Sequence, residues 1–252
     1  MAGTAIHGGL VWRVGTLVER RRETATAHSL VLDVPDWPGH DAGQHVDVRL
    51  TAPDGYSAVR SYSIASAAQE KRLELTIEEL ADGEVSPYLA ETAAPGDPLE
   101  IRGPIGGWFV WRPAQTEPVQ LIAGGSGIVP LMAMIRTRAQ AKSAAPFRLL
   151  YSVRSPQAIS YANELEQRVH DDANLGVTFA YTRSVPEGWA RAPQRIDATA
   201  IMEAAFAPAL RPSCYVCGPT PFVEAAANLL IAAGHDADRI KTERFGPTAG
   251  GS

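Results

Sequence analysis

The chain has 252 residues, of which 45% are hydrophobic and 20% charged, a balance that excludes disordered, collagen-like and low-complexity proteins. Its two cysteines, Cys214 and Cys217, are too few for a disulfide framework or for an iron–sulfur cluster held by four thiolates of this chain. The net charge of −5 arises before Pro113, where 10 Lys and Arg face 16 Asp and Glu, and neither half has the basic composition of a nucleic-acid binder. No apolar run approaches the ~18 residues of a membrane span and residues 1–14 lack a signal pattern, so we expect a cytoplasmic protein.

The first part of the chain consists of short β-rich runs separated by Gly, Pro and Asp. We expect strands at residues 11–18, 29–34, 45–50, 60–64, 73–79 and 99–102. Such a series favours an antiparallel barrel or sandwich. The pattern breaks at residues 111–118, which we interpret as a linker between a domain over residues 1–113 and a second domain over residues 118–252.

The second part alternates apolar strands with amphipathic helices. We expect strands at residues 119–123, 147–153, 177–182, 214–217 and 240–243, and helices at residues 130–141, 160–169, 197–206 and 221–233. Because parallel strands need crossover connections, this alternation predicts a parallel sheet covered by helices on both faces.

Two short motifs stand out in the first part. The run Arg60-Ser61-Tyr62-Ser63 is an expected strand, in which alternation puts Arg60 and Tyr62 on one side and the serines on the other. Downstream, Gly83-Glu84-Val85-Ser86 precedes Pro87, and we expect Ser86 to cap a short helix whose free amides face a diphosphate. A capped helix without a ligand is the alternative.

Two motifs also stand out in the second part. Gly124, Gly125 and Gly127 follow an apolar strand and precede Pro130 at the start of a helix, an arrangement that lets backbone approach a pyrophosphate. A purely structural turn uses the same glycines. The cysteine pair fits neither a zinc site, which needs further ligands, nor a redox dithiol, so we expect no metal. Cys217 lies at the carboxyl end of its strand, where open α/β sheets bind ligands, and Cys214 is expected to be a buried packing residue.

Taken in order, these motifs resemble those of the ferredoxin–NADP reductase superfamily. The resemblance covers residues 11–246 and consists of R-x-Y-S, G-x-V-S, G-G-S-G-x-x-P, C-G-P and a C-terminal E-x-F. It implies an N-terminal FAD-binding antiparallel β-barrel and a C-terminal α/β nucleotide-binding domain. Some relatives carry a fused iron–sulfur domain, and from the two cysteines we expect none in this chain.

The resemblance also implies roles for individual residues. Arg60 would pair with the FAD pyrophosphate, Tyr62 would pack on the flavin, and Ser61 and Ser63 belong to the same motif, with Ser63 near flavin N5. The diphosphate site would be completed by Gly83, Val85 and Ser86. The NAD(P) pyrophosphate turn would contain Gly124, Gly125, Gly127 and Pro130, and the nicotinamide pocket would contain Cys217, Gly218 and Pro219. Ser63, Cys217 and Glu243 would position and polarise the reacting groups, and Phe245 would cover the flavin. The seven residues after Phe245 depart from relatives that end at this aromatic, and such a tail is an alternative cover.

Two arginines bear on which nucleotide is used. Arg154 follows the second expected strand of the α/β half without a nearby acidic residue, and Arg183 follows the third. Because arginine accommodates a 2′-phosphate whereas an acidic residue binds a free ribose, we expect NADPH rather than NADH.

Three functions remain open at this point. The first is an FAD-dependent NAD(P)H oxidoreductase that passes electrons to a separate redox protein, such as a ferredoxin, a Rieske-type component, a haem protein or a molybdenum enzyme. The second is a reductase of free flavin or quinone. The third is a flavin- or nucleotide-binding regulatory module without turnover.

Overall fold

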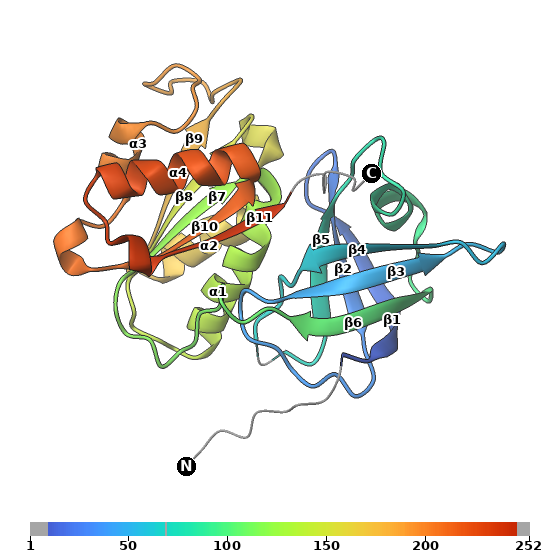
Figure 1. The fold of residues 1–252 in the computed structure, drawn as a ribbon. Coiled ribbons are helices and arrows are strands. Elements are labelled where there is room, and N and C mark those ends of the chain that lie inside the picture. The colour runs from blue at the N-terminus through green and yellow to red at the C-terminus, as the bar shows by residue number, and fades with distance from the viewer. Residues whose placement is uncertain (1–9, 69, 246–252) are drawn as a thin grey trace, which may run out of the picture.

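The computed structural model describes residues 10–68 and 70–245, which form two halves side by side (Figure 1). The first half is a six-stranded antiparallel sheet in the order β4-β3-β6-β1-β2-β5. Its strands are β1 (Trp12–Arg22), β2 (Ala27–Asp33), β3 (His45–Thr51), β4 (Ser57–Ser63), β5 (Leu73–Glu78) and β6 (Pro98–Ile105). An isolated bridge between Ile64 and Leu75 joins the two ends of this order, which closes the sheet into the expected barrel.

The second half is a five-stranded parallel sheet in the order β11-β10-β7-β8-β9. Its strands are β7 (Val119–Gly124), β8 (Phe147–Val153), β9 (Leu175–Tyr181), β10 (Ser213–Pro219) and β11 (Ile240–Phe245). Its helices are α1 (Ile128–Gln140), α2 (Ala162–Asp171), α3 (Ala198–Ala204) and α4 (Thr220–Ala232). The short helical turns are η1 (Tyr88–Thr92), η2 (Gly125–Gly127), η3 (Pro156–Ala158), η4 (Pro208–Leu210) and η5 (Ala237–Arg239). The fold class predicted from the sequence is confirmed.

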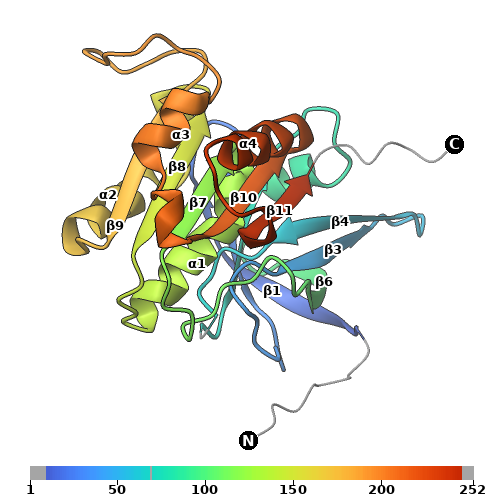
Figure 2. The same ribbon diagram turned by 60° about the vertical axis from the view of Figure 1, so that its left-hand side comes forward.

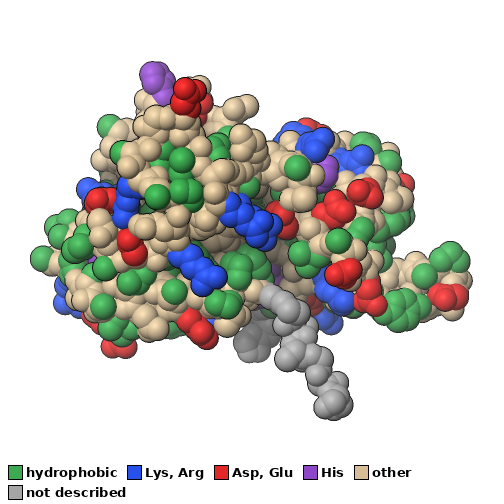
Figure 3. All heavy atoms as spheres, turned by 90° about the horizontal axis from the view of Figure 1, so that it is seen from above, with side chains coloured by type: hydrophobic (Ala, Val, Ile, Leu, Met, Phe, Trp, Pro, Cys, Tyr) green, Lys and Arg blue, Asp and Glu red, His purple; other side chains and the backbone are tan. Residues whose placement is uncertain are grey.

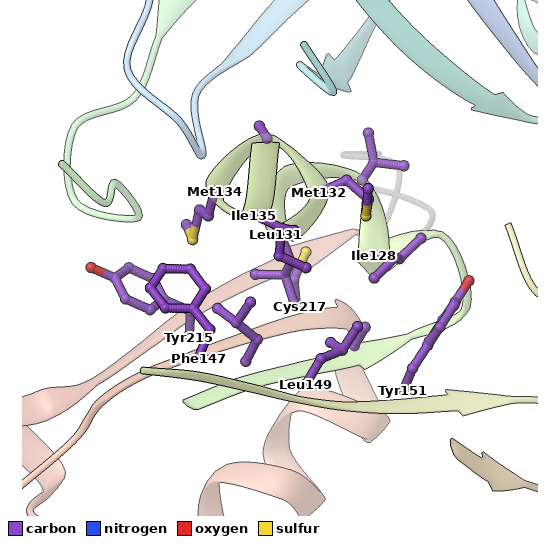
Figure 4. Packing of buried hydrophobic residues seen from close by; sticks show 14 of the residues in the cluster. Ile128, Leu131, Met132, Met134, Ile135, Phe147, Leu149, Tyr151, Tyr215 and Cys217 are labelled. Carbon is purple, nitrogen blue, oxygen red and sulfur yellow. The ribbon is translucent and has the colours of Figure 1, made fainter. Parts of the chain in front are cut away.

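Two apolar clusters cover the two faces of the parallel sheet. On one face, α1 and α2 pack over residues that include Leu149 and Tyr215, and Figure 4 shows the α1 side chains directed at the strands. On the other face, α3 and α4 pack over Ile122 and Val216 (Figure 2). Burial on both faces explains why these strands read as continuous apolar runs.

The segment interpreted as a linker is anchored at its first residue. The Trp111 side chain is fully buried and its ring meets that of Phe147 edge-on, with centroids 5.1 Å apart. Its backbone also bridges to Ala42 of the barrel half. The expectation of a linker beginning at residue 111 is therefore wrong at this residue, because a buried tryptophan contributes to the core that the two halves share.

Candidate functional site

The two halves meet at a polar contact between a barrel strand and the last strand of the parallel sheet. The Ser63 hydroxyl, at the end of β4, donates a hydrogen bond of 3.3 Å to Oε1 of Glu243 on β11. These residues are 180 positions apart in the chain. The fold thus brings together two of the three residues to which the resemblance gives a catalytic role.

The environment of Glu243 changes its ionisation. Burial raises the pKa of this carboxyl to about 7, and the hydrogen bond from Ser63 opposes the shift. Desolvation disfavours the charged carboxylate, which is the physical cause of the shift. Near neutral pH, Glu243 therefore holds its proton in a substantial fraction of molecules.

Cys217 lies beside Glu243 in the sheet. It pairs in register with Glu243 on one side and Ala123 on the other. The side chain is fully buried, and Figure 4 shows its sulfur directed toward α1 near Leu131. Burial, with a smaller contribution from the negative charge of Glu243, raises the thiol pKa well above its usual value near 9. Cys217 is thus held as a neutral thiol, and its place in a nicotinamide pocket stays a prediction.

Three of the predicted glycines are required for close packing. A Cβ on Gly127 would lie 2.1 Å from the carbonyl oxygen of Cys217, so only glycine lets the start of α1 approach β10 this closely. A Cβ on Gly124 or on Gly218 would collide with the ring of Phe222, at 2.6 and 2.7 Å respectively. Close packing therefore accounts for glycine at all three positions.

Gly125 is the glycine that faces open space. Its φ of +55° is in the left-handed region, and no atom lies within 4 Å of a Cβ built there. The helix that follows has Gly127 at its N-cap and receives no side-chain cap from the residues described. An accessible backbone with uncapped amides at a helix start fits a diphosphate.

The prolines and the aromatic residue of the predicted site lie at the ends of elements. Pro130 is buried in the first turn of α1. Pro219 is exposed, precedes α4 and pairs in register with Phe245, the last residue of β11. Phe245 is 36% exposed. The expectation that the tail after Phe245 covers a flavin lies outside the described residues.

The two barrel motifs come together through Glu84. The Arg60 side chain donates to Oε2 of Glu84 at 2.7 Å, and the Tyr56 hydroxyl donates to Oε1 at 3.0 Å. Arg60 and Glu84 are both half exposed, so the guanidinium fork faces solvent beside the Gly83–Ser86 loop. An exposed arginine of this kind fits a diphosphate, which accepts bidentate hydrogen bonds.

The expected helix cap at Ser86 is wrong. The Ser86 hydroxyl accepts a hydrogen bond from the backbone amide of Leu80 at 3.1 Å, and Pro87 is the residue before the five-residue turn η1. Ser86 therefore closes the loop that contains it. A Cβ at Gly83 would lie 2.7 Å from the Ser86 hydroxyl oxygen, so this loop requires glycine there. Val85 is fully buried in the barrel core, and its place in a diphosphate site stays a prediction.

The remaining residues of the strand motif face different surroundings. Tyr62 is partly buried against the barrel core, and burial raises its pKa to about 12. The Ser61 hydroxyl donates to Oδ1 of Asp47 at 2.7 Å, and Arg102 binds the other oxygen of that carboxylate. Ser61 thus has a partner within the barrel itself.

The two predicted nucleotide-binding arginines are neighbours. Arg154 follows β8 and Arg183 is two residues after β9, and the amide of Arg183 donates to the carbonyl of Arg154 at 2.9 Å. Both side chains are exposed. Seen from above, Lys and Arg side chains of the α/β half gather beside its junction with the barrel (Figure 3).

Sequence reasoning missed two charged residues near the site. Glu84 occupies the variable position of G-x-V-S, where no pattern marks it. Arg136 lies within the apolar run of α1 and is 8% exposed. An arginine on the buried face of a helix was the available signal, since such a charge must find partners.

Comparison with known families decides the identity of both halves. Residues 16–110 match the family model described as an oxidoreductase FAD-binding domain, and residues 121–228 match that of an oxidoreductase NAD-binding domain. The chain belongs to the ferredoxin–NADP reductase superfamily.

Members of this superfamily share sequence and structure with the chain. The reductase subunit of glycine betaine monooxygenase from Pseudomonas aeruginosa is 31% identical over 208 residues, which are 82% of this chain and 56% of that protein. The ferredoxin reductase component of 3-ketosteroid-9-alpha-monooxygenase from Mycolicibacterium smegmatis is 30% identical over 231 residues, 88% of this chain and 62% of that protein. The chain thus covers less than two thirds of each relative.

A solved structure extends the likeness to the whole fold. The FAD/NAD-binding domain of nitric oxide dioxygenase from Vibrio cholerae superposes with a TM-score of 0.82 at 25% identity, covering 93% of this chain and 99% of that domain. The chain therefore consists of an FAD-binding barrel and an NAD-binding α/β half. Within residues 10–68 and 70–245, no helix is long and apolar enough to cross a membrane, and no group of His, Cys, Asp and Glu is arranged to hold a metal ion.

Proposed function

We propose that the chain is an FAD-dependent NAD(P)H oxidoreductase that passes electrons to a separate redox protein. The hydrogen bond between Ser63 and Glu243 carries this proposal, because it joins the end of the R-x-Y-S strand to the carboxyl end of the parallel sheet. The two cofactor-binding halves thereby meet at this polar contact.

The chemistry assigned to this contact needs little from the protein beyond placement. A bound nicotinamide supplies a hydride and a bound flavin accepts it and can release the electrons singly. Ser63 and Glu243 hold hydrogen-bonding groups at the junction, and the fully buried Cys217 keeps that side of the sheet dry. Ser63, Cys217 and Glu243 are therefore positioning and polarising groups in this proposal, with no strong base required.

NADPH is the proposed nucleotide. The support is that Arg154 and Arg183 lie side by side, exposed, after two adjacent parallel strands. Two guanidinium groups suit a 2′-phosphate.

The proposed acceptor is a separate redox protein, and the proposed location is the cytoplasm. The relatives above are named as a reductase subunit and a ferredoxin reductase component of monooxygenases, which supports this partner class. A small acceptor such as free flavin or quinone is the second candidate, and it needs no docking partner.

An anaerobic titration tests the proposal. We expect the purified protein to bind FAD, to be yellow, and to bleach when NADPH is added. Bleaching without fast reduction of an added carrier protein would favour the flavin or quinone reductase, and FAD binding without bleaching would favour a regulatory module. A protein that binds no FAD would overturn both reductase proposals.

A further inference from the structure

The helix that begins at the glycine turn is also fastened to the FAD-binding half. Arg136 of α1 donates from Nη1 to the carbonyl oxygen of Ala65 at 2.9 Å and to Oε1 of Glu74 at 2.8 Å. Ala65 is two residues after Ser63, and Glu74 belongs to β5. One side chain therefore links the helix that follows Gly125 and Gly127 to the segment that follows the R-x-Y-S strand.

The other donor atoms of Arg136 bind within the α/β half. Its Nε and Nη2 donate to the two oxygens of Glu164 on α2, at 2.9 and 2.6 Å. Its guanidinium carbon lies 5.1 Å from the centre of the Tyr161 ring. The guanidinium is thus held by both halves at once, in a planar geometry that a lysine ammonium does not reproduce.

Thr137, the next residue of α1, makes a second bond to the same segment. Its hydroxyl accepts a hydrogen bond of 3.0 Å from the backbone amide of Ala68, and its side chain is 2% exposed. The segment after β4 is therefore bound at two points by consecutive residues of α1.

The barrel side of this contact is itself anchored. The second oxygen of Glu74 accepts a hydrogen bond of 2.8 Å from Arg21 on β1. Farther along, the Tyr161 amide donates to Glu23 at 3.1 Å and its hydroxyl is paired with Thr76. These bonds tie the loop before α2 to the barrel strands, so the junction resists rotation of one half against the other.

We propose that Arg136 and Thr137 are positioning residues for hydride transfer: they fix the nucleotide-binding helix α1 relative to the strand that ends at Ser63. The inference rests on the proposed function, since placement matters only where both cofactors bind. The expected effect is on the step that requires both halves, because a misplacement of about 1 Å is enough to slow a transfer reaction by up to roughly 100-fold.

The chain provides a matched control on the same helix. Arg138 is 2% exposed and binds the carbonyl oxygen of Ala145 at 2.6 Å and the carboxylate of Asp172, both within the α/β half. Arg138→Lys therefore disturbs a buried arginine of α1 without touching the FAD-binding half. Thr137→Ser retains the hydroxyl and is the conservative partner of Thr137→Val.

The test measures two half-reactions by anaerobic stopped flow. At saturating NADPH we expect Arg136→Lys to slow flavin bleaching about tenfold and Thr137→Val about threefold, with Arg138→Lys and Thr137→Ser near the wild-type rate. Reoxidation of the dithionite-reduced proteins by ferricyanide and the FAD dissociation constant, measured by fluorescence, should stay unchanged because both depend on the barrel half. If Arg136→Lys does not fold, the Thr137 pair carries the comparison.

Two different failures are distinguishable. If the wild-type protein binds FAD but is not bleached by NADPH or NADH, the proposed function is wrong and the positioning role falls with it. If the wild type is bleached and Arg136→Lys behaves like Arg138→Lys, or slows reoxidation equally, only the positioning role is overturned.

Discussion

At the scale of single residues, the site depends on how burial alters Glu243. The carboxyl has a pKa of about 7 in the folded protein against an ordinary value of 4.5. Between these two values the folded chain retains the Glu243 proton while the unfolded chain has released it. Raising the pH through this window therefore lowers the free energy of unfolding.

Glu243→Gln removes this pH-dependent cost. We expect the gain in unfolding free energy of the variant over wild type to be about 2–3 kcal/mol larger at pH 8 than at pH 5. Urea unfolding at both pH values measures it. Glu224→Gln, at an exposed position of α4, should leave the difference between the two pH values unchanged. The same gain for Glu243→Gln at both pH values would contradict the shifted pKa.

The nucleotide preference is also decided by single residues. Arg154→Ala and Arg183→Ala should each raise the KM for NADPH about tenfold and leave the KM for NADH unchanged, since a hydrogen bond to a charged group contributes roughly 1.5–3 kcal/mol. Steady-state kinetics with both nucleotides measure this. Arg211→Ala is the control, because Arg211 precedes β10 and so lies at the amino ends of the parallel strands, whereas Arg154 and Arg183 follow carboxyl ends. Equal losses with NADPH and NADH would contradict a 2′-phosphate site.

The sequence predicted some of the residues at the site and missed others. The order of motifs was sufficient to expect Ser63 and Glu243 at one site, and the fold brings them into contact. It was not sufficient to find Glu84 or Arg136, because their importance comes from partners that are distant in the chain. Alternation and spacing describe a local segment and contain no information on such tertiary pairs.

At the scale of elements, the glycine turn combines packing with an open backbone. The sequence predicted a strand, a turn and a helix here, and all three are present. Periodicity succeeds for these elements because burial on both sheet faces enforces it. The cap rule failed at Ser86: the short helical segment is present, but the Ser86 hydroxyl accepts from the Leu80 amide instead of capping it.

Gly127→Ala tests the packing role of the turn. The added methyl would lie 2.1 Å from the Cys217 carbonyl oxygen, so α1 and β10 must separate. We expect a loss of about 3 kcal/mol in unfolding free energy, at the upper end for overpacking. Urea unfolding measures it, with Gly107→Ala as control because nothing lies within 4 Å of a Cβ at Gly107. Similar losses for the two variants would show that the close approach is unimportant.

At the scale of the whole molecule, one of the apolar clusters contains residues of both halves. The cluster under α1 includes Ala42, Ala65, Phe109 and Trp111 from the first part of the chain. Composition changes along the sequence indicate where a chain leaves one sheet for another, but they do not reveal whether the crossing segment is buried. The boundary near residue 113 therefore stays a prediction, and the shared cluster could not be predicted from the sequence.

A shared core predicts that both halves unfold together. Trp111→Ala should lower the free energy of unfolding by about 3–5 kcal/mol, as expected for a large buried aromatic side chain. Because Trp111 packs on Phe147 and bridges to Ala42, the loss should appear equally in FAD release, which reports on the barrel, and in circular dichroism at 222 nm, which reports on the helices of the α/β half. Trp108→Ala is the matched control, since Trp108 is 66% exposed and surface substitutions usually change stability by less than about 0.5 kcal/mol. Two separate transitions, with only one of them shifted by Trp111→Ala, would mean that the halves are independent and that the buried tryptophan belongs to one of them alone.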